Sequence, residues 1–498
     1  MKRKNTYISI LLTSLGLMTL LASCEKSLDE VSYDKFSGSS FYKTEEDAKL
    51  AVTAVYSSMN SGGYSIWGVG YPGIVAQSSA STDEMVVSWG WPGWPLFNQL
   101  NLSETFPGDA LFQFYNILMP TITNATINIG KIEAMNIADG NLKKRYIGEL
   151  KALRAHYSQI LYNYYGPVPV RLDPVEAANP DAKPIPRPSQ QDMVAQIEKD
   201  YKEAADALPA ASEQGSADYG RFTKDACLMG LVKLYMHEKK WPEVITTCRS
   251  IQGMGHSLQG NYADIFSYAN NGSKQEILLA VSCRPDANST NIWLAHALPG
   301  NYADPSGKEV TQWGGYKMPW ATYDKFNPND KRLARLLAKW PTTGGATFDA
   351  RANGYIGAIP MKYGIDPNAT GEGHGTNIVV WRYADVLLSL AEAINETSGP
   401  TAEAYNLVKE VRNRAGLGGL PDGLGKDQFR DKLKDERLFE FWCEGGIRRE
   451  DLIRWGTYIK RATDAGSTFA KPEFVLWPIP RKAIDESKGV IKQNPGYN

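Results

Sequence analysis

The run of residues 141–166 constrains the fold of this chain more than any other stretch, because it has the apolar spacing of a long amphipathic helix. Charged residues such as Glu149 and Arg154 fall mostly on the other face, and Gly166 followed by Pro167 ends the run. A one-sided helix of about 25 residues is not stable alone, so other helices must cover its apolar stripe. That stripe consists of Tyr146, Leu150, Leu153, Tyr157, Ile160, Leu161 and Tyr164.

The rest of the sequence predicts further helices that stack in pairs. Residues 223–251 and 382–415 each read as a helical hairpin of roughly 30 residues, which is typical of tetratricopeptide-like repeats, although the Trp and Pro landmarks of that repeat are missing. Additional helices are expected near residues 44–62, 107–135, 189–208, 427–444 and 447–457, and residues 166–190 are rich in proline and predict an extended crossing. The predicted fold is therefore mainly α.

The N-terminus has the pattern of a bacterial lipoprotein signal. Lys2, Arg3 and Lys4 precede an apolar stretch at 7–21, and small residues lead to Cys24. We predict a signal peptide at 1–23, a lipidated Cys24 and a polar tether at 24–40; the alternative is an ordinary secretory signal with a chance cysteine. Lipid on Cys24 would anchor the chain to a membrane without spanning it, because no later stretch reaches 18 apolar residues.

Charge and cysteine content exclude several classes of protein. The net charge of −1 argues against a nucleic-acid binder. Cys227, Cys248, Cys283 and Cys443 show no C-x-x-C pattern, and the five histidines show no zinc spacing, so no metal or cofactor is expected. Cys227 and Cys248 could face each other across a helical hairpin, as a disulfide or as buried free thiols.

Two segments lack clear periodicity and are the candidates for function. We predict one unit at 41–498, with a helical scaffold at about 41–63, 105–251 and 377–457 and a loop-rich, short-strand ligand face at about 64–104 and 255–376. Their high Trp and Tyr content argues against disorder.

The first irregular segment holds seven aromatic residues between positions 64 and 97. At its centre, Gly and Pro separate Trp89, Trp91 and Trp94, which indicates a stiff surface loop without a helix interior. Exposed indoles form an apolar patch that requires an explanation, and their flat faces suit sugar rings. The alternative is that these rings fold back into the core.

The second irregular segment holds a similar group of aromatics among Asn, Asp and Gln residues, and the two groups could converge on one shallow site. The same alternative of burial applies. The members are Trp293, Tyr302, Trp313, Tyr316, Trp320 and Tyr323.

Asp83 and Glu84 precede the first aromatic group and are the one carboxylate pair that suggests catalysis. A glycosidase needs two carboxyls across a cleft, and neighbours in sequence rarely share a substrate. A role of Asp83 in hydrogen bonding to hydroxyls, or a local cap, is the simpler interpretation. No nucleophile elbow, P-loop or dinucleotide-binding motif is present.

The chain resembles the SusD/RagB family of surface lipoproteins over nearly its whole length. The family's Phe-Glu-Gly-x-Arg turn is altered at 444–448 (EGGIR), which has an apparent extra residue. The matching motifs are Cys24, 41–48 (FYKTEEDA), Tyr56, 82–84 (TDE), 149–157 (ELKALRAHY), 165–169 (YGPVP), 382–388 (RYADVLL), 391–393 (AEA), 411–416 (VRNRAG), 436–440 (ERLFE), 448–456 (RREDLIRWG), 478–480 (PIP) and 493–497 (QNPGY).

The resemblance implies four tetratricopeptide-like pairs, binding without catalysis, an outer-membrane location facing the exterior, and a SusC-like TonB-dependent barrel as partner. We therefore expect capture of oligosaccharides, with a peptide-binding scaffold and a glycoside hydrolase as the alternatives. The family has no fixed ligand motif, so the site residues follow from the aromatic argument alone. They are Trp91, Trp94 and Trp293, with Trp89, Tyr302, Trp313, Tyr316 and Trp320 as secondary candidates and Asp83 as a hydrogen-bonding group.

Overall fold

The computed structural model describes residues 41–60, 65–70, 73–103, 105–286, 289–369 and 371–497. The predicted signal peptide, the tether and Cys24 lie outside the described residues. Among those described, no helix is both long enough and apolar enough to cross a membrane.

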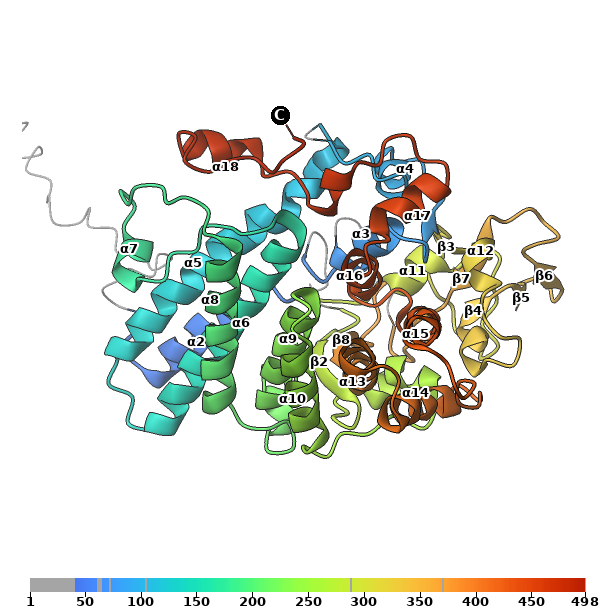
Figure 1. Ribbon diagram of the computed structural model, residues 1–498, viewed down its shortest axis with the longest axis horizontal. Coiled ribbons are helices and arrows are strands. Elements are labelled where there is room, and N and C mark those ends of the chain that lie inside the picture. The colour runs from blue at the N-terminus through green and yellow to red at the C-terminus, as the bar shows by residue number, and fades with distance from the viewer. Residues whose placement is uncertain are drawn as a thin grey trace, which may run out of the picture.

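Helix α6 (Gly140–Tyr165) confirms the predicted central helix. The Asp139 carboxylate accepts from the backbone N–H groups of Asn141 and Leu142 at its start, and Gly166 with φ 71° ends it. The helix packs against α5 (Gln113–Ala134), α8 (Gln190–Ala207) and α2 (Glu45–Tyr56) (Figure 1). Its second half is buried on all sides.

Two charged residues of α6 that we expected on the outer face are buried. Arg154 makes two 2.8 Å hydrogen bonds to the Asp200 carboxylate of α8, and Glu149 pairs with Arg145 and Arg221. Burial of these charges is tolerated because each has an opposite charge at hydrogen-bonding distance.

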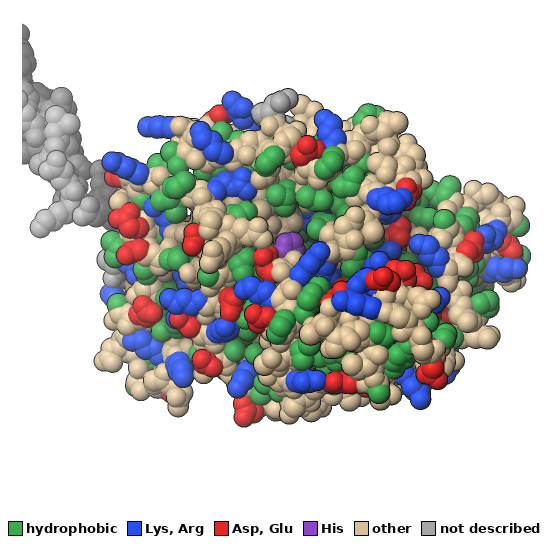
Figure 2. All heavy atoms as spheres, viewed as in Figure 1, with side chains coloured by type: hydrophobic (Ala, Val, Ile, Leu, Met, Phe, Trp, Pro, Cys, Tyr) green, Lys and Arg blue, Asp and Glu red, His purple; other side chains and the backbone are tan. Residues whose placement is uncertain are grey.

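The predicted helical hairpins are present and stack side by side, which confirms the mainly α fold. α9 (Lys224–His237) pairs with α10 (Trp241–Gln252), α10 packs on α13 (Tyr383–Ser398), and α13 pairs with α14 (Ala402–Arg414). Gly230 of α9 is required because a Cβ there would lie 2.4 Å from the ring of Tyr201 on α8. The C-terminal helices are α15 (Lys426–Phe441), α16 (Ile447–Arg454), α17 (Tyr458–Asp464), η8 (Pro472–Val475) and α18 (Arg481–Glu486). Figure 2 shows Lys and Arg interspersed with Asp and Glu across the face formed by these helices.

The two irregular segments contain short elements, of which β3 to β7 lie at one end of the molecule, whereas β2 lies near its middle beside α9 (Figure 1). The four-stranded antiparallel sheet has the order β1-β3-β7-β4, and the pairs β2–β8 and β5–β6 are separate. Its pairing of β1 with β3 joins the first irregular segment to the second, with Val86 opposite Lys317 and Val87 opposite Tyr316. The strands are β1 (Val86–Val87), β2 (Ile277–Val281), β3 (Tyr316–Pro319), β4 (Leu336–Leu337), β5 (Lys339–Pro341), β6 (Thr347–Asp349), β7 (Gly357–Pro360) and β8 (Ile378–Arg382).

Short helices interrupt segments that we expected to be without helix. The expectation is wrong for α3 (Ile74–Ala80), for α4 (Gly93–Asn98) and, in the proline-rich crossing, for α7 (Pro174–Ala178). Pro is compatible with the first turn of a helix, where no N–H partner is needed, and α4 and α7 both use it there. The other short helices are η3 (Pro107–Phe112), η4 (Ser216–Asp218), η5 (Tyr262–Phe266), η6 (Tyr268–Asn270), α11 (Trp293–Ala297), α12 (Trp320–Tyr323) and η7 (Lys331–Arg335).

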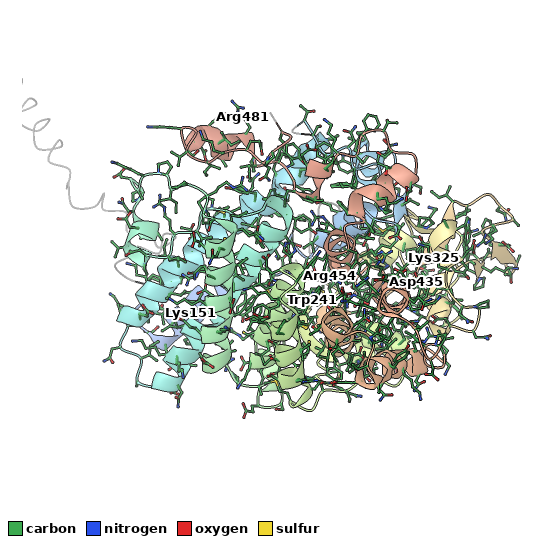
Figure 3. The ribbon with its side chains drawn as sticks, in the orientation of Figure 1. Lys151, Trp241, Lys325, Asp435, Arg454 and Arg481 are labelled. Atoms are coloured by element: carbon green, nitrogen blue, oxygen red, sulfur yellow. The ribbon has the colours of Figure 1, made fainter. Side chains whose placement is uncertain are left out.

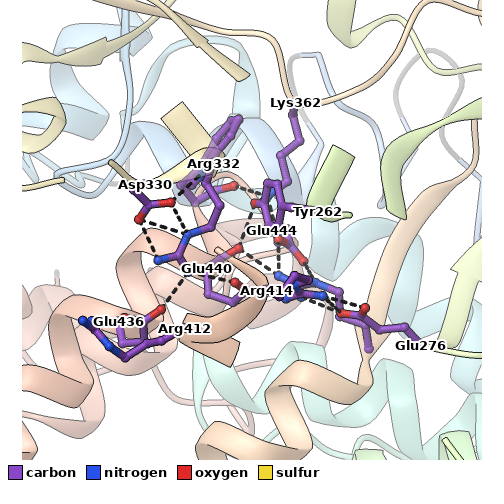
Figure 4. Close-up of polar contacts among 12 residues, drawn as sticks. Tyr262, Glu276, Asp330, Arg332, Lys362, Arg412, Arg414, Glu436, Glu440 and Glu444 are labelled. Atoms are coloured by element: carbon purple, nitrogen blue, oxygen red, sulfur yellow. Dashed lines mark hydrogen bonds and ion pairs between the residues drawn. The ribbon is translucent and has the colours of Figure 1, made fainter. Parts of the chain in front are cut away.

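A buried ion network connects the second irregular segment to α15 (Figure 4). The Glu440 carboxylate accepts from Arg332 of η7 (2.9 Å), Arg382 of β8 and Arg414 of α14. Burial alone raises the pKa of Glu440, but these three guanidinium groups outweigh that effect and hold the pKa below its usual range. Glu440 therefore stays ionised inside the protein.

The neighbouring Glu444 extends the same network. It accepts from Arg382 (2.7 and 2.8 Å) and from the Lys362 ammonium (2.6 Å), which also donates to the Tyr262 hydroxyl at 2.7 Å. Burial lowers the pKa of Lys362 to about 8, while the Glu444 carboxylate opposes that shift.

All four cysteines of the described chain are buried free thiols, so the structure favours the second of the two alternatives for Cys227 and Cys248. Burial raises the pKa of both thiols well above its usual value.

We predict that Glu440→Gln lowers the free energy of unfolding by about 3–5 kcal/mol at pH 7, because it leaves buried guanidinium groups without their counter-charge. The native pKa of Glu440 lies below the ordinary value of 4.5, so this contribution is present above that pH and is lost as pH falls. The difference between variant and wild type should therefore shrink in acid. Urea unfolding at several pH values measures it.

The control for this measurement is Glu486→Gln on α18, where the carboxylate is 67% exposed and pairs with Lys482. This change should alter stability by less than about 1 kcal/mol. Equal losses in the two variants would contradict the role of Glu440.

Candidate ligand-binding surface

The pairing of β1 with β3 brings one tryptophan from each irregular segment together. The Ser88 N–H donates to Gly315 O at 2.9 Å, and the indole N–H of Trp89 donates to Trp313 O at 3.3 Å. Trp89 and Trp313 are 224 positions apart in the chain. The structure thus brings together two of the predicted aromatic residues, one from each group.

The Trp89 ring packs closely against Gly315, His296 and Tyr316. A Cβ at Gly315 would lie 2.2 Å from the Trp89 ring, so only glycine lets the indole lie flat on the strand. The ring centroids of His296 and Tyr316 are 4.9 and 5.4 Å from that of Trp89. The indole is therefore held in one orientation by packing and by its N–H bond.

Trp313 is the more accessible of the two. Trp313 is 46% exposed, and its backbone N–H donates to Ala295 O at 2.6 Å. Its ring meets His296 edge-on at 4.8 Å. Burial lowers the pKa of His296 to about 4, so this imidazole is neutral at physiological pH and acts as an aromatic support.

Two side chains that the sequence analysis missed complete this surface. His296 links the two indoles, and the Lys317 ammonium donates to Ser88 Oγ at 2.7 Å and to Gly314 O at 2.9 Å. The alternation of β3 is the signal that would have found Lys317, since Tyr316 and Met318 face the core and Lys317 faces the other side. We name Trp89 and Trp313, together with the buried His296 and Lys317 that support them, the aromatic surface.

Four of the predicted ligand residues are buried, and the prediction is wrong for each. Trp94 is 3% exposed because α4 turns its ring inward against Trp91, Phe97 and Tyr316. Trp293 of α11 is fully buried and donates its indole N–H to Pro360 O at 2.7 Å. The other two are Tyr316, whose hydroxyl donates to Val69 O at 2.8 Å, and Tyr302, which is 5% exposed.

Trp91 and Trp320 are half-buried and lie outside the aromatic surface as defined. The Trp91 ring covers Gly93 and meets Trp94 edge-on at 5.3 Å. Trp320 donates its indole N–H to Tyr355 O at 2.6 Å, and the Arg351 guanidinium lies 4.0 Å above its ring. One face of Trp320 is therefore already occupied by a cation.

The Asp83 carboxylate, which we predicted to bind a ligand, is instead paired with Arg448 inside the protein. Its carboxylate accepts two 2.8 Å hydrogen bonds from Arg448 of α16 and lies 3.5 Å from Lys325, which is labelled in Figure 3. Burial raises its pKa, but Arg448 and Lys325 outweigh that effect and bring it to about 2.

Glu84 is 1% exposed, and burial raises its pKa to about 7. The pair Asp83–Glu84 therefore does not present an acid and a base to a cleft, and the predicted glycosidase arrangement is not formed by these residues.

Comparison with known proteins gives consistent matches. A family model described as SusD family matches residues 344–497, and one described as starch-binding associating with outer membrane matches 34–236. SusD-like protein P38 of Formosa agariphila is 26% identical over the full length of both chains, and a SusD-like protein of Bacteroides ovatus is 24% identical over 88% of this chain and 81% of its own.

Solved structures share the fold. A SusD homolog from Bacteroides thetaiotaomicron matches with a TM-score of 0.78 at 24% identity, covering 91% of this chain and 97% of its own. Surface glycan-binding protein A of the same organism, in complex with laminarihexaose, matches with a TM-score of 0.74 at 20% identity, covering 91% and 100%. The chain belongs to the SusD/RagB family.

We predict that Asp83→Asn lowers stability by about 3–5 kcal/mol, because Arg448 loses a buried counter-charge. Affinity for a neutral oligosaccharide should stay within about twofold, since Asp83 does not face the aromatic surface. Thermal unfolding and calorimetric titration test both parts. The matched control is Asp422→Asn on an exposed turn, which should change neither quantity. Loss of affinity in a stable Asp83→Asn protein would instead support the original prediction that Asp83 contacts the ligand.

Proposed function

We propose that this protein is a cell-surface lipoprotein that captures oligosaccharides on the aromatic surface and passes them to a TonB-dependent outer-membrane transporter. The observation that carries the proposal is the exposed indole of Trp313 beside the fixed indole of Trp89. A sugar ring has a flat C–H face that packs on an indole and hydroxyls at its edge that bind polar groups. The laminarihexaose complex of the related surface glycan-binding protein A supports this class of ligand.

Rigidity of the aromatic surface supports capture of weakly binding sugars. Trp89 is held by Gly315, His296 and a hydrogen bond to the Trp313 carbonyl, so little side-chain freedom is lost when a ligand binds. Ser88 is exposed beside the rings, and its hydroxyl, which accepts from Lys317 at 2.7 Å, keeps a second acceptor lone pair for a sugar hydroxyl. Trp91 of the same segment packs against Trp94 and stays outside this surface.

The anchor and the partner follow from the N-terminal motif and the family. We infer that lipid on Cys24 holds one unit, residues 41–498, to the outer membrane through the tether at 24–40. The family description, starch-binding associating with outer membrane, supports that location. We also propose that a SusC-like barrel receives the captured ligand. Because Asp83 is paired with Arg448 and Glu84 is buried, these two carboxylates support a binding role without catalysis.

A peptide-binding scaffold is the second candidate, and one groove favours it. Trp241 of α10 and Trp455, which follows α16, line a groove of about 350 Å³ together with Glu392, Arg430 and Arg454. Figure 3 shows Trp241 and Arg454 close together between the helices. The Trp455 indole donates to Glu392 at 2.8 Å, so this groove combines aromatic area with charged groups that suit a peptide.

We predict that Trp313→Ala and Trp89→Ala each lower affinity for a bound oligosaccharide about tenfold, and that the double variant shows no measurable binding, because each indole contributes a central contact. A glycan array with the soluble form, lacking residues 1–24, first identifies the ligand. Isothermal titration then measures the affinity of each variant.

The control is Trp241→Ala, which removes a half-buried indole from the helical face and should leave affinity unchanged. Circular dichroism checks that each variant is folded. Unchanged affinity in the folded double variant, or loss of binding in the control alone, would refute the aromatic surface as the site and favour the groove at Trp241.

A further inference from the structure

A second groove lies beside the loop that carries Trp313. It has a volume of about 550 Å³, within the range of small-molecule sites, and its lining includes Asp304, Lys308, Arg335, Met361, Ile365 and Pro367. Residues 304–308 form one lip, and the same loop continues to Trp313 nine residues after Asp304. The groove therefore shares a loop with the aromatic surface.

Arg335 has unused hydrogen-bond donors at this groove. Its Nη2 donates to the carbonyl oxygens of Tyr363 (2.5 Å) and Lys362 (3.5 Å), while its Nε is buried and has no partner among the described residues. Of the described chain, no residue accepts a hydrogen bond from Nη1. Nε is therefore an unsatisfied buried donor, and Nη1 is a solvent-accessible donor without a protein partner in the described ranges.

The absence of a counter-charge distinguishes Arg335 from its neighbour Arg332. Arg332 pairs with Asp330, Glu436 and Glu440 at 2.8–2.9 Å, whereas Arg335 forms no ion pair with any carboxylate in the described ranges. Burial is the main influence on the pKa of Arg335 and lowers it. Arg335 is half-buried, so its charge without a carboxylate partner carries part of the cost of desolvation, and an incoming anion would offset that cost.

Lys308 supplies a second positive charge. Its ammonium donates to Pro367 O at 3.0 Å and, within the described residues, pairs with no carboxylate. Asp304 is the carboxylate at the groove, and its oxygen accepts from the Ser306 N–H at 3.1 Å and from the Ser306 hydroxyl, which keeps it in its own turn. Two cations with free donors thus face one engaged carboxylate.

We propose that this groove binds the anionic group of an acidic saccharide, a uronate carboxylate or a sulfate ester, with Arg335 donating from its guanidinium and Lys308 supplying the second charge. The planar guanidinium presents paired N–H groups that match the oxygens of a carboxylate or sulfate, and Met361, Ile365 and Pro367 offer apolar contact to a ring. The inference rests on the proposed saccharide binding and adds the chemical class of the ligand.

The test uses isothermal titration of the soluble chain with four probes: a neutral β-glucan hexasaccharide, a sulfated counterpart, an oligouronate of equal length, and inorganic sulfate. The variants are Arg335→Gln, Arg335→Lys and Lys308→Gln, with Lys331→Gln as an exposed control of equal charge on the same 3-10 helix. Circular dichroism confirms folding. If the Arg335 variants fail to fold, Lys308→Gln still tests the groove, because the Lys308 side chain is partly exposed and its loss should not disturb the fold.

We expect at least one acidic probe to bind about tenfold more tightly than the neutral one, since a charge-assisted hydrogen bond supplies that much. Arg335→Gln and Lys308→Gln should remove this preference, Arg335→Lys should retain part of it, and Lys331→Gln should retain all of it. Which acidic probe responds distinguishes a carboxylate from a sulfate ligand.

Equal affinity for acidic and neutral probes, or a preference that persists in both Arg335→Gln and Lys308→Gln, would overturn the inference while leaving neutral binding at the aromatic surface intact. Binding of inorganic sulfate as tight as that of the acidic saccharides would also overturn it, because the sugar would then contribute nothing. Conversely, if Trp89→Ala with Trp313→Ala removes neutral binding but spares an acid preference that depends on Arg335, the groove stands apart from the proposed aromatic site.

Discussion

The ion pairs between Glu440 and three arginines hold the two parts of this protein together. Arg332 comes from the loop-rich part, while Arg382 and Arg414 come from β8 and α14, and all converge on one carboxylate of α15. Burying such charges costs several kcal/mol per ion unless every partner is in place. Through Arg332 the network therefore ties the second irregular segment to α15.

That constraint explains how a surface built from short elements can be rigid. The strands β1, β3 and β7 contain only two to four residues each, too few to form a stable sheet alone. They are stabilised by the helices behind them and by contacts such as the Asp83–Arg448 pair, which connects the segment before β1 to α16. Trp89 and Trp313 therefore meet on a frame whose position is set elsewhere in the chain.

The chemistry of this end of the molecule suits binding. Asp83 is paired and Glu84 is buried, whereas Trp313 keeps an exposed ring and Arg335 keeps free donors. Neutral His296 supports the indoles without adding charge. An aromatic surface for neutral rings and a positively charged groove on the same loop would together select among saccharides by shape and by charge.

The sequence alone determined the helical scaffold, because apolar periodicity in α6 and in the hairpins is a local property that survives in the folded chain. It also predicted a ligand face in the two irregular segments, and that remains a prediction. Which aromatics face solvent was decided by tertiary structure: Trp94 and Trp293 lie in the same kinds of segment as Trp89 and Trp313, yet α4 and α11 turn their rings into the core. The alternation of β3 points to Lys317, whereas nothing in the sequence marked His296 or Arg335 as site groups, because their surroundings come from residues far away in the chain. The exposure of a side chain in a loop depends on what packs against it, and that partner is set by long-range contacts.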